Sequence, residues 1–257
     1  MDLFHALILA AVEGVTEFLP VSSTGHLILT SHALGIADTE FVKSFEIIIQ
    51  LGAILAVVVL YFKTLLYKRQ YWPKLLLAFL PTAIVGFTLY PLIKHILLGN
   101  PIFTLISLFV GGIALIVIEK IYKEKEDHVA DLAHITQKQA MMIGCFQSIS
   151  VIPGVSRAAA TIIGGMLSGV KRQTSVEFSF LLAIPTMLAA SGFDLLKTHA
   201  SFTSSQYQIL AIGFVGAFVF ALISVKYFIQ FIKNHNFVPF GIYRIVLSIL
   251  YFLVIFR

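Results

Sequence analysis

The chain has 257 residues, of which 58% are hydrophobic and only 12% are charged, and its formal net charge is +5. Its mean hydropathy is +0.94. These values lie far outside the averages of soluble globular domains, so the sequence predicts an integral membrane protein with membrane lipids, and no nucleic acid, as partners. The single cysteine, Cys145, excludes an intramolecular disulfide and leaves oxygen or histidine ligands for any metal.

Six apolar runs are long enough to cross a bilayer, which takes about 20 helical residues. These runs are 44–62, 75–93, 103–121, 177–195, 207–226 and 239–257. Each of them is predicted to be a transmembrane helix. Short connections join them, so we expect a single integral membrane domain over residues 1–257.

Two further apolar regions, 1–34 and 140–168, are each interrupted near the middle by Pro, Gly and Ser residues, and their halves are too short to span a bilayer. Non-helical backbone at membrane depth is tolerated only inside protein or beside a water-filled cavity. Both regions are therefore predicted to be re-entrant helical hairpins. The predicted fold is an all-α polytopic membrane protein with six transmembrane helices and two such hairpins.

The Lys and Arg residues indicate the orientation. Twelve of them share one side if that side is formed by Lys226 and the connections 63–74, 119–139, 169–176 and 227–238. The other side receives four basic residues: Lys43, Lys94, Lys197 and Arg257. By the positive-inside rule the first side is cytoplasmic, so both termini face outward and the first hairpin enters from outside. Arg157 and Arg244 remain near or within the membrane.

The two halves of the chain are predicted to be an inverted repeat. An offset of 133 residues carries Pro20 onto Pro153 and Ser23 onto Ser156, and it maps the predicted helices of one half onto those of the other. Each half, about 1–121 and about 134–257, then contains one hairpin and three crossings. Because three is odd, the second half is inverted, and inverted repeats with broken helices place their binding site at the repeat interface.

The first hairpin contains an unusual polar segment, EGVTEFLPVSSTGH, between Glu13 and His26. Glu13 and Glu17 are spaced i and i+4, so they lie on one face of a helix and repel each other unless a cation binds beside them. Carboxylate oxygens are preferred ligands of Mg²⁺ and Ca²⁺, which makes a divalent metal the favoured interpretation. The alternative is that one carboxylate is protonated or that both reach water.

Pro20 ends the helix that carries these carboxylates, and Ser22, Ser23, Thr24 and His26 follow. Helix capping accounts for one of the three hydroxyls. The free amides of a helix N-terminus beside hydroxyls form an anion site, which accounts for the rest. Because Ser23 and His26 are three residues apart, the imidazole is expected to reach the hydroxyl and act as its base.

The second hairpin supplies positive charge. In the segment SISVIPGVSRAAATIIGG, the break at Pro153 is followed by Ser156, Arg157 and Thr161. The planar guanidinium of Arg157 suits phosphate or carboxylate oxygens, although an arginine that extends to the membrane surface is the usual alternative. Together the two hairpins predict a phosphoryl-transfer site, with Ser22, Thr24, Ser156 and Thr161 as further phosphate contacts.

Three other polar side chains lie in apolar surroundings: Glu46, Gln50 and Gln147. Glu46 and Gln50 are spaced i and i+4 on the span that follows the first hairpin. Gln147 precedes the break of the second hairpin. We expect them to line the same cavity, with hydrogen bonding between helices as the alternative.

At these residues the chain resembles the bacterial undecaprenyl-diphosphate phosphatases of the bacitracin-resistance type. The segment from Glu13 to Leu27, EGVTEFLPVSSTGHL, fits the first signature of that family, and PGVSR from Pro153 to Arg157 opens the second. Length, spacing and hydropathy agree over essentially the whole chain. The match departs after Arg157, where the family commonly has Ser-Gly and this chain has Ala158 and Ala159.

The resemblance implies hydrolysis of undecaprenyl diphosphate to the monophosphate that cell-wall synthesis reuses. It implies a divalent metal and a multi-pass protein of the bacterial inner membrane, with an active site open to the periplasmic or extracellular side. Carried over by position, Glu13 and Glu17 match the acidic pair, Ser23 and His26 the catalytic serine and histidine, and Arg157 the phosphate-binding arginine. We expect Ser23 to be the nucleophile, His26 its base, Glu13 a metal ligand, and Glu17 to orient His26 or share the metal.

Other functions stay open on sequence grounds. Inverted repeats with broken helices are as typical of secondary transporters and anion channels as of enzymes, and a lipid flippase is a third interpretation. Transport explains Arg157 but has little use for a serine beside a histidine and a carboxylate pair. The expected partner is therefore a polyprenyl diphosphate lipid, and a homodimer is also compatible with the sequence.

Overall fold

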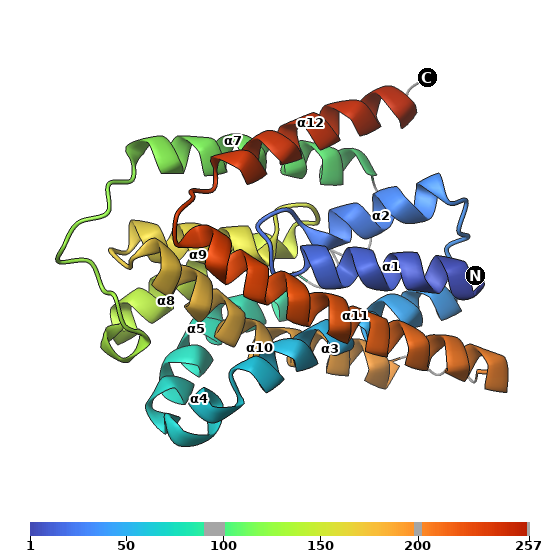
Figure 1. Ribbon diagram of the computed structural model, residues 1–257, viewed down its shortest axis with the longest axis horizontal. Coiled ribbons are helices and arrows are strands. Elements are labelled where there is room, and N and C mark those ends of the chain that lie inside the picture. The colour runs from blue at the N-terminus through green and yellow to red at the C-terminus, as the bar shows by residue number, and fades with distance from the viewer. Residues whose placement is uncertain (90–100, 198–201, 256–257) are drawn as a thin grey trace.

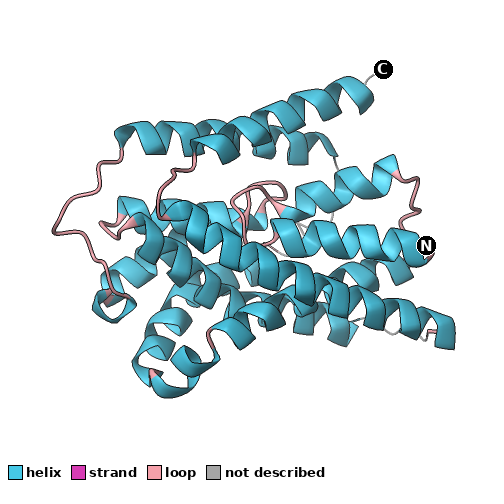
Figure 2. Ribbon diagram, viewed as in Figure 1, coloured by secondary structure: helices cyan, strands magenta, loops and turns pink. Residues whose placement is uncertain are grey.

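The computed structural model describes residues 1–89, 101–197 and 202–255. In these ranges every regular secondary-structure element is a helix (Figures 1 and 2). The α-helices are α1 Leu3–Thr16, α2 Ser23–Ala33, α3 Glu40–Leu60, α4 Phe62–Tyr67, α5 Trp72–Thr88, α7 Pro101–Ile121, α8 Gln137–Ser148, α9 Arg157–Leu167, α10 Arg172–Lys197, α11 Ser204–Ile232 and α12 Val238–Ile255. Short 3-10 helices cover Arg69–Tyr71, Leu132–His134 and Ile149–Val151. The ends of two predicted spans, 90–93 and 256–257, and the side chains of Lys94 and Arg257 lie outside the described residues.

Five helical segments of the described chain are long and apolar enough to cross a membrane. They correspond to the predicted spans that begin at residues 44, 75, 103, 177 and 207, and they make the chain a multi-pass membrane protein. The sixth predicted span, 239–257, coincides with α12. Its apolar part, Val238–Leu253, is shorter than the other five by the same measure.

Both predicted interruptions are present, and each is followed by a helix with the same kind of cap. Ser22 precedes α2 with φ 71°, and Ser156 precedes α9 with φ 77°. The Ser22 hydroxyl accepts a hydrogen bond from the Gly25 amide at 3.3 Å, and the Ser156 hydroxyl accepts one from the Ala159 amide at 3.2 Å. Each serine thus satisfies one amide that the helix itself leaves free.

The equivalence of these caps corrects the predicted alignment of the repeat by one residue. Ser22, and not Ser23, corresponds to Ser156, and Ser23 corresponds to Arg157 as the first residue of its helix. The second break holds one extra residue, Gly154, with φ 90°. A Cβ atom there would lie 2.5 Å from the Thr104 carbonyl oxygen, so only glycine fits. A fixed offset cannot detect such a single insertion.

Two helices, α11 and α5, each pack mainly against two others (Figure 1). Helix α11 packs against α1 and α3, while α5 packs against α8 and α10. Helix α3 also contacts α10, and α7 pairs with α12. The α7–α12 pair approaches closely at Gly112 and Gly241, where a Cβ on either residue would lie 2.7 Å from the carbonyl oxygen of the other.

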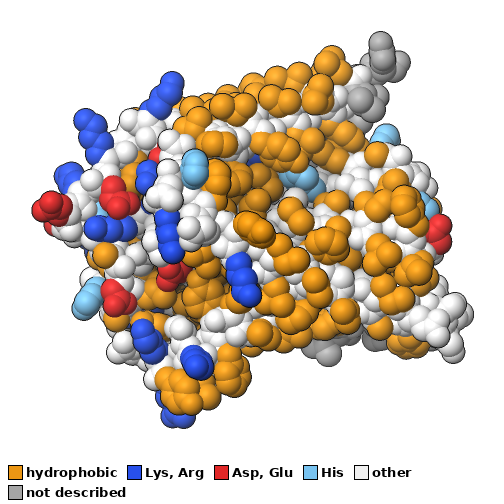
Figure 3. Space-filling view, in the orientation of Figure 1, with side chains coloured by type: hydrophobic (Ala, Val, Ile, Leu, Met, Phe, Trp, Pro, Cys, Tyr) orange, Lys and Arg blue, Asp and Glu red, His pale blue; other side chains and the backbone are white. Residues whose placement is uncertain are grey.

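Charge is distributed unequally along the bundle. Most Lys and Arg side chains on the visible face gather at one end of the molecule, the left in Figure 3. The start of α1 and the end of α12 lie at the opposite end (Figure 1). At the basic end, Arg172 binds Glu119 through two hydrogen bonds of 3.0 and 2.8 Å, and Glu119 also accepts the Phe237 amide at 3.0 Å. This contact ties α7, α10 and the start of α12 together.

The Arg244 side chain of α12 is fully buried and binds both interruptions. Its guanidinium donates to the Pro20 carbonyl at 3.2 Å and to the carbonyls of Gly154 and Val155 at 2.8 and 3.0 Å. The remaining donors reach the carbonyls of Ser107 and Leu108 on α7 at 3.1 and 3.2 Å. A guanidinium has five N–H donors, and here all five are used. Three of them satisfy carbonyls at the breaks, which no helix pairs internally, and the other two bind carbonyls inside α7.

We therefore expect Arg244→Lys to lower the free energy of unfolding by at least about 2 kcal/mol. An ammonium has three donors, so at least two of the five hydrogen bonds are lost, and a hydrogen bond to a charged group contributes about 1.5–3 kcal/mol. Denaturant titration of the purified chain in detergent measures the change. Lys226→Arg, on the exposed part of α11, is the control and should unfold like the parent. Equal stability of Arg244→Lys and the parent would contradict the assignment.

Candidate active site

The two helix breaks, between α1 and α2 and between α8 and α9, meet at Glu17. One carboxylate oxygen of Glu17 accepts a hydrogen bond from the Ser23 hydroxyl, and the other forms an ion pair of 2.9 Å with Arg157 Nη2. The side chains of Arg157 and Glu17 are only 10% and 6% exposed. The segments around the two breaks thus contribute a carboxylate, a hydroxyl and a guanidinium to one buried cluster, which we call the tip cluster: Glu17, Ser23 and Arg157.

Arg157 is held by further contacts from the second half. Its Nη1 donates to the Ser179 carbonyl at 2.9 Å and to the Ser179 hydroxyl at 3.3 Å, and its guanidinium lies 5.6 Å from the centre of the Phe18 ring. Its Nε is buried and has no hydrogen-bond partner in the part of the chain that the structure describes. One donor of this guanidinium is thus left over for an anion.

Thr161 is fully buried one helical turn after Arg157. Its hydroxyl is hydrogen-bonded to the Arg157 carbonyl at 2.9 Å and to the Ser179 hydroxyl at 2.6 Å. Both partners belong to the protein, so a phosphate contact by Thr161 stays a prediction. Thr161 therefore positions Ser179, which in turn positions Arg157.

Both ring nitrogens of His26 form hydrogen bonds within the protein. Nδ1 lies 2.8 Å from the Ser22 carbonyl oxygen, and Nε2 lies 2.7 Å from the Tyr243 hydroxyl. A carbonyl can only accept, so Nδ1 carries the proton and Nε2 accepts from the tyrosine in the neutral ring. The Tyr243 ring also stacks on the imidazole, with centroids 5.5 Å apart and planes 8° from parallel.

This geometry corrects two predicted contacts of His26. The Ser23 hydroxyl donates to Glu17, so it is not bonded to His26, and Glu17 binds Ser23 and Arg157 instead of orienting His26. The reason is local: His26 lies one turn into α2, and its ring folds back onto the carbonyl of the N-cap residue Ser22. The spacing of three residues allowed a contact, and the helix N-terminus offered the imidazole a better acceptor.

Glu13 lies one turn before Glu17 and is also buried. Its Oε1 atom has no hydrogen-bond partner among the described residues, and Glu17 and Glu46 are close enough to repel its charge. An unpartnered buried carboxylate oxygen beside a second carboxylate fits a hard cation. Within residues 1–89, 101–197 and 202–255, however, no three His, Cys, Asp or Glu side chains converge to hold a metal by themselves. Two carboxylates suffice for Mg²⁺, which often completes its shell with water and substrate phosphate.

The other predicted phosphate contacts lie around the tip cluster. Ser22 and Ser156 are buried, and their hydroxyl oxygens cap α2 and α9. Thr24 is exposed in the first turn of α2, next to Ser23. Each serine hydroxyl still has a proton to donate, since in the cap it serves as the acceptor.

Two of the three residues that were expected to line the cavity form hydrogen bonds between helices. The Gln50 carbonyl oxygen accepts a 3.0 Å hydrogen bond from Ser191, which links α3 to α10. Gln147 is fully buried and binds Thr82 at 2.8 Å and Thr186 at 3.3 Å, which links α8 to α5 and α10. Both amides thus follow the alternative of hydrogen bonding between helices. Glu46 is half-buried on α3 and acts on Glu13 through its charge.

Three residues that contact the site were missed from the sequence: Ser179, Tyr243 and Arg244. Arg244 gave a detectable signal, because an arginine inside an apolar run is expensive and marks a buried partner. Tyr243 and Ser179 gave none. Their partners lie 217 residues away in His26 and 22 residues away in Arg157, and tyrosine and serine are ordinary residues of membrane helices.

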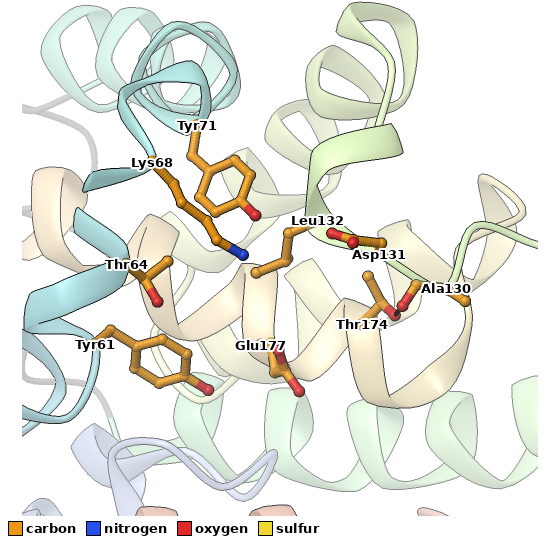
Figure 4. A pocket seen from close by; sticks show the side chains of 9 residues that line it. All are labelled: Tyr61, Thr64, Lys68, Tyr71, Ala130, Asp131, Leu132, Thr174 and Glu177. Carbon is orange, nitrogen blue, oxygen red and sulfur yellow. Dashed lines mark hydrogen bonds between the residues drawn. The ribbon is translucent and has the colours of Figure 1, made fainter. Parts of the chain in front are cut away.

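A polar pocket of about 280 Å³ lies at the basic end of the molecule, and its side chains converge around Lys68 and Glu177 (Figure 4). It is lined by Tyr61, Thr64, Lys68, Tyr71, Ala130, Asp131, Leu132, Thr174 and Glu177. None of the residues predicted to carry the chemistry lines it. The tip cluster therefore remains the candidate active site.

The chain is similar to known proteins over nearly its whole length. A family model described as "Bacitracin resistance protein BacA" matches residues 6–250, which include both helix breaks. An undecaprenyl-diphosphatase of Aquifex aeolicus is 54% identical over 251 residues, which cover 98% of each chain. One of Persephonella marina is 51% identical over 253 residues, covering 98% of this chain and 99% of the relative. One of Wolinella succinogenes is 50% identical over 251 residues, covering 98% and 97%.

The ion pair between Glu17 and Arg157 predicts strong coupling in a double-mutant cycle. Glu17→Gln should lower the free energy of unfolding by about 3–5 kcal/mol, because it leaves a buried guanidinium without its counter-charge. Adding Arg157→Gln should restore part of that loss, since the second change removes the unpaired charge. Denaturant titration in detergent measures all four proteins.

The exposed pair Glu40 and Lys43, 3.5 Å apart, serves as the matched control. Its cycle should give a coupling below about 1 kcal/mol, as is usual for solvated ion pairs. Additive effects of the two substitutions at Glu17 and Arg157 would show that the buried pair is not coupled.

Proposed function

Because the chain belongs to the bacitracin resistance protein BacA family, we propose that it hydrolyses undecaprenyl diphosphate to undecaprenyl phosphate and inorganic phosphate. The three relatives described above bear the name undecaprenyl-diphosphatase and are at least 50% identical to it over nearly their whole length. The observation that carries the proposal is the hydrogen bond from Ser23 to a carboxylate that also binds Arg157. Such an enzyme regenerates the lipid carrier of cell-wall synthesis and thereby confers resistance to bacitracin.

We assign the nucleophile to Ser23. Its oxygen attacks the terminal phosphorus while its proton passes to Glu17, with which it is already hydrogen-bonded. The bond between that phosphorus and the bridging oxygen breaks, and undecaprenyl phosphate leaves. Water then attacks the phosphoserine, which releases inorganic phosphate and returns the hydroxyl.

Arg157 links substrate binding to this step. In the structure Glu17 neutralises its charge at 2.9 Å. Phosphate oxygens compete for the same guanidinium, whose Nε is free of a protein partner among the described residues. The Glu17 oxygen that the arginine leaves becomes free for the divalent cation expected at Glu13 and Glu17, while the other oxygen stays hydrogen-bonded to Ser23 and can take its proton. Arg157 meanwhile stabilises the charge that develops on the phosphoryl group.

We propose that His26 handles protons in the second half of the reaction. Its Nε2 accepts from Tyr243 in the structure, so in this arrangement it is not available to attack phosphorus. Exchange of Tyr243 for water or for the leaving phosphate oxygen would let the imidazole accept or return a proton. His26 as the nucleophile is the alternative, and the nature of the phosphoenzyme separates the two.

We propose that Glu13 and Glu17 hold a divalent cation, Mg²⁺ or Ca²⁺. Support comes from the unpartnered Glu13 oxygen and from the spacing of the two carboxylates on α1. A bound cation would neutralise diphosphate charge and polarise the phosphoryl oxygens. A pair of carboxylates with room for substrate oxygens suits Mg²⁺ better than Ca²⁺, which takes six to eight oxygen ligands.

We further propose that residues 1–257 form one domain of two inverted repeats, about 1–121 and about 134–257, with six transmembrane helices and two re-entrant hairpins. The paired caps at Ser22 and Ser156, and the matching packing of α11 and α5, support this arrangement. The concentration of Lys and Arg at one end supports a cytoplasmic position for that end. The site would then open to the periplasmic or extracellular side of a bacterial inner membrane.

The proposed activity predicts phosphate release from undecaprenyl diphosphate by the purified chain in detergent with Mg²⁺. Arg157→Ala and His26→Ala should each lower kcat by at least about a hundredfold, because they remove a charge clamp and a proton carrier. Ser23→Ala should form no phosphoenzyme. With substrate labelled in the terminal phosphate, rapid quenching of the parent should trap label that survives acid and is lost in alkali, as phosphoserine does.

Each other outcome has a definite meaning. Label that is lost in acid and survives alkali would move the nucleophile to His26. No phosphate release with either Mg²⁺ or Ca²⁺ would overturn the enzyme and leave lipid transport as the function of the tip cluster. Lys226→Arg is again the control and should retain the parental rate.

Glu13→Gln should raise the Mg²⁺ concentration required for half-maximal rate by about tenfold or more, because it removes one of two charged ligands. The rate is measured across Mg²⁺ concentrations after treatment with a chelator. Glu46→Gln is the comparison, since it removes a nearby charge without removing a proposed ligand. If Glu13→Gln titrates like the parent, Glu13 is not a metal ligand.

A further inference from the structure

A second surface feature adjoins the tip cluster. An apolar groove of about 660 Å³ runs between α1, α11 and α12. We call it the lateral groove. Figure 3 shows the hydrophobic side chains that cover this face, over the helices labelled in Figure 1. Its walls include Val15, Leu19, Phe220, Ile223, Phe231 and Phe240.

The walls of the lateral groove offer almost nothing to a polar ligand. The thirteen described residues that line it include no charged side chain. The hydroxyls of Thr16 and Ser224 donate to the carbonyls of Val12 and Val15 at 2.7 and 2.8 Å, so they are already used within the protein. The groove therefore suits a hydrocarbon chain.

One end of the groove adjoins the tip cluster. Thr16 immediately precedes Glu17, and Val21 precedes the Ser22–Ser23 pair. Tyr243 lines the groove with its ring and donates its hydroxyl to His26 at 2.7 Å. A molecule in the groove would thus meet Tyr243 at the point where the apolar surface gives way to the polar site.

We propose that the lateral groove binds the prenyl tail of the substrate while the diphosphate occupies the tip cluster; this inference rests on the proposed function. The choice of the prenyl tail over the acyl chain of a bilayer phospholipid follows from that adjacency. A ligand that fills both regions must carry phosphate at the end of a long apolar chain. Tyr243 then lies at the junction of the two parts and is a positioning residue for His26.

The groove orients the substrate and contributes little hydrophobic free energy to its binding. Lipid tails are as apolar as the groove walls, so transfer of a prenyl tail from the bilayer releases little hydrophobic free energy. A tail held along α11 directs the diphosphate toward Ser23 and lowers the entropy lost on binding. The groove should therefore favour long-chain substrates over short ones.

The proposal can be tested by a substitution that fills the groove at a residue outside the catalytic segment. Ile223 is 48% exposed on α11, so a larger side chain fits there without disturbing the core. Ile223→Trp should raise KM for undecaprenyl diphosphate about three- to tenfold and change kcat/KM for a diphosphate with one isoprene unit by less than about twofold. Phe220→Ala, which widens the groove, should act in the same direction.

The matched control is Ile212→Trp. Ile212 is 38% exposed on the same face of α11, about three helical turns earlier, and does not line the groove. It should leave both substrates unaffected. Equal changes for the long and the short substrate in Ile223→Trp, or unchanged KM for the long substrate in both groove variants, would overturn the proposal.

A binding experiment separates this inference from the proposed activity. Undecaprenyl phosphate with a photoreactive diazirine in its first isoprene units should label residues 220–231, and unlabelled undecaprenyl phosphate should prevent it. Equal labelling by a diazirine phosphatidylglycerol that undecaprenyl phosphate does not displace would make the groove an ordinary lipid contact. If the parent protein hydrolyses neither diphosphate, the proposed function fails, and the labelling alone decides the occupant of the groove.

Discussion

The guanidinium of Arg244 allows two broken helices to end inside a membrane protein. Each break frees backbone carbonyls that no water can satisfy at that depth, and an unsatisfied carbonyl there is expensive. Arg244 donates to Pro20 in the first break and to Gly154 and Val155 in the second, and it also binds two carbonyls of α7. The charge is spread over five acceptors, so it needs no carboxylate. One side chain of α12 thereby holds the two breaks together.

The geometry of the tip cluster follows from that arrangement. The caps Ser22 and Ser156 are equivalent, so Ser23 and Arg157 occupy the same position at the start of α2 and α9. One half of the molecule thus supplies a hydroxyl where the other half supplies a cation, and Glu17 binds both. The two helix starts are equivalent in backbone structure, and the site is asymmetric because one carries a serine and the other an arginine. The buried ion pair holds the cluster together until an anion competes for Arg157.

Much of this could be predicted because it is local. Runs of apolar residues predict membrane helices, and five of the six are confirmed. Proline and serine at a break predict a helix end and a cap, and the caps at Ser22 and Ser156 are confirmed. The contact between His26 and Ser23 was predicted wrongly, since spacing along a helix says which residues can meet but not which acceptor is better. The one-residue insertion at Gly154 and the interhelical role of Gln147 depend on neighbours that are distant in sequence.

The sequence by itself determined that the protein lies in a membrane, how many long apolar helices it has, where the two breaks fall and to which family it belongs. It also determined the residue types that the chemistry needs. Hydropathy, proline and short motifs carry that information, because each acts within one or two helical turns. Only the tertiary structure decided that Glu17 binds Ser23 and Arg157, that Tyr243 takes the free nitrogen of His26, and that Arg244 joins the breaks. These contacts join residues up to 224 positions apart. Their partners are chosen by which carbonyl or carboxylate remains unsatisfied once the helices have packed, and no pattern along the chain records that choice.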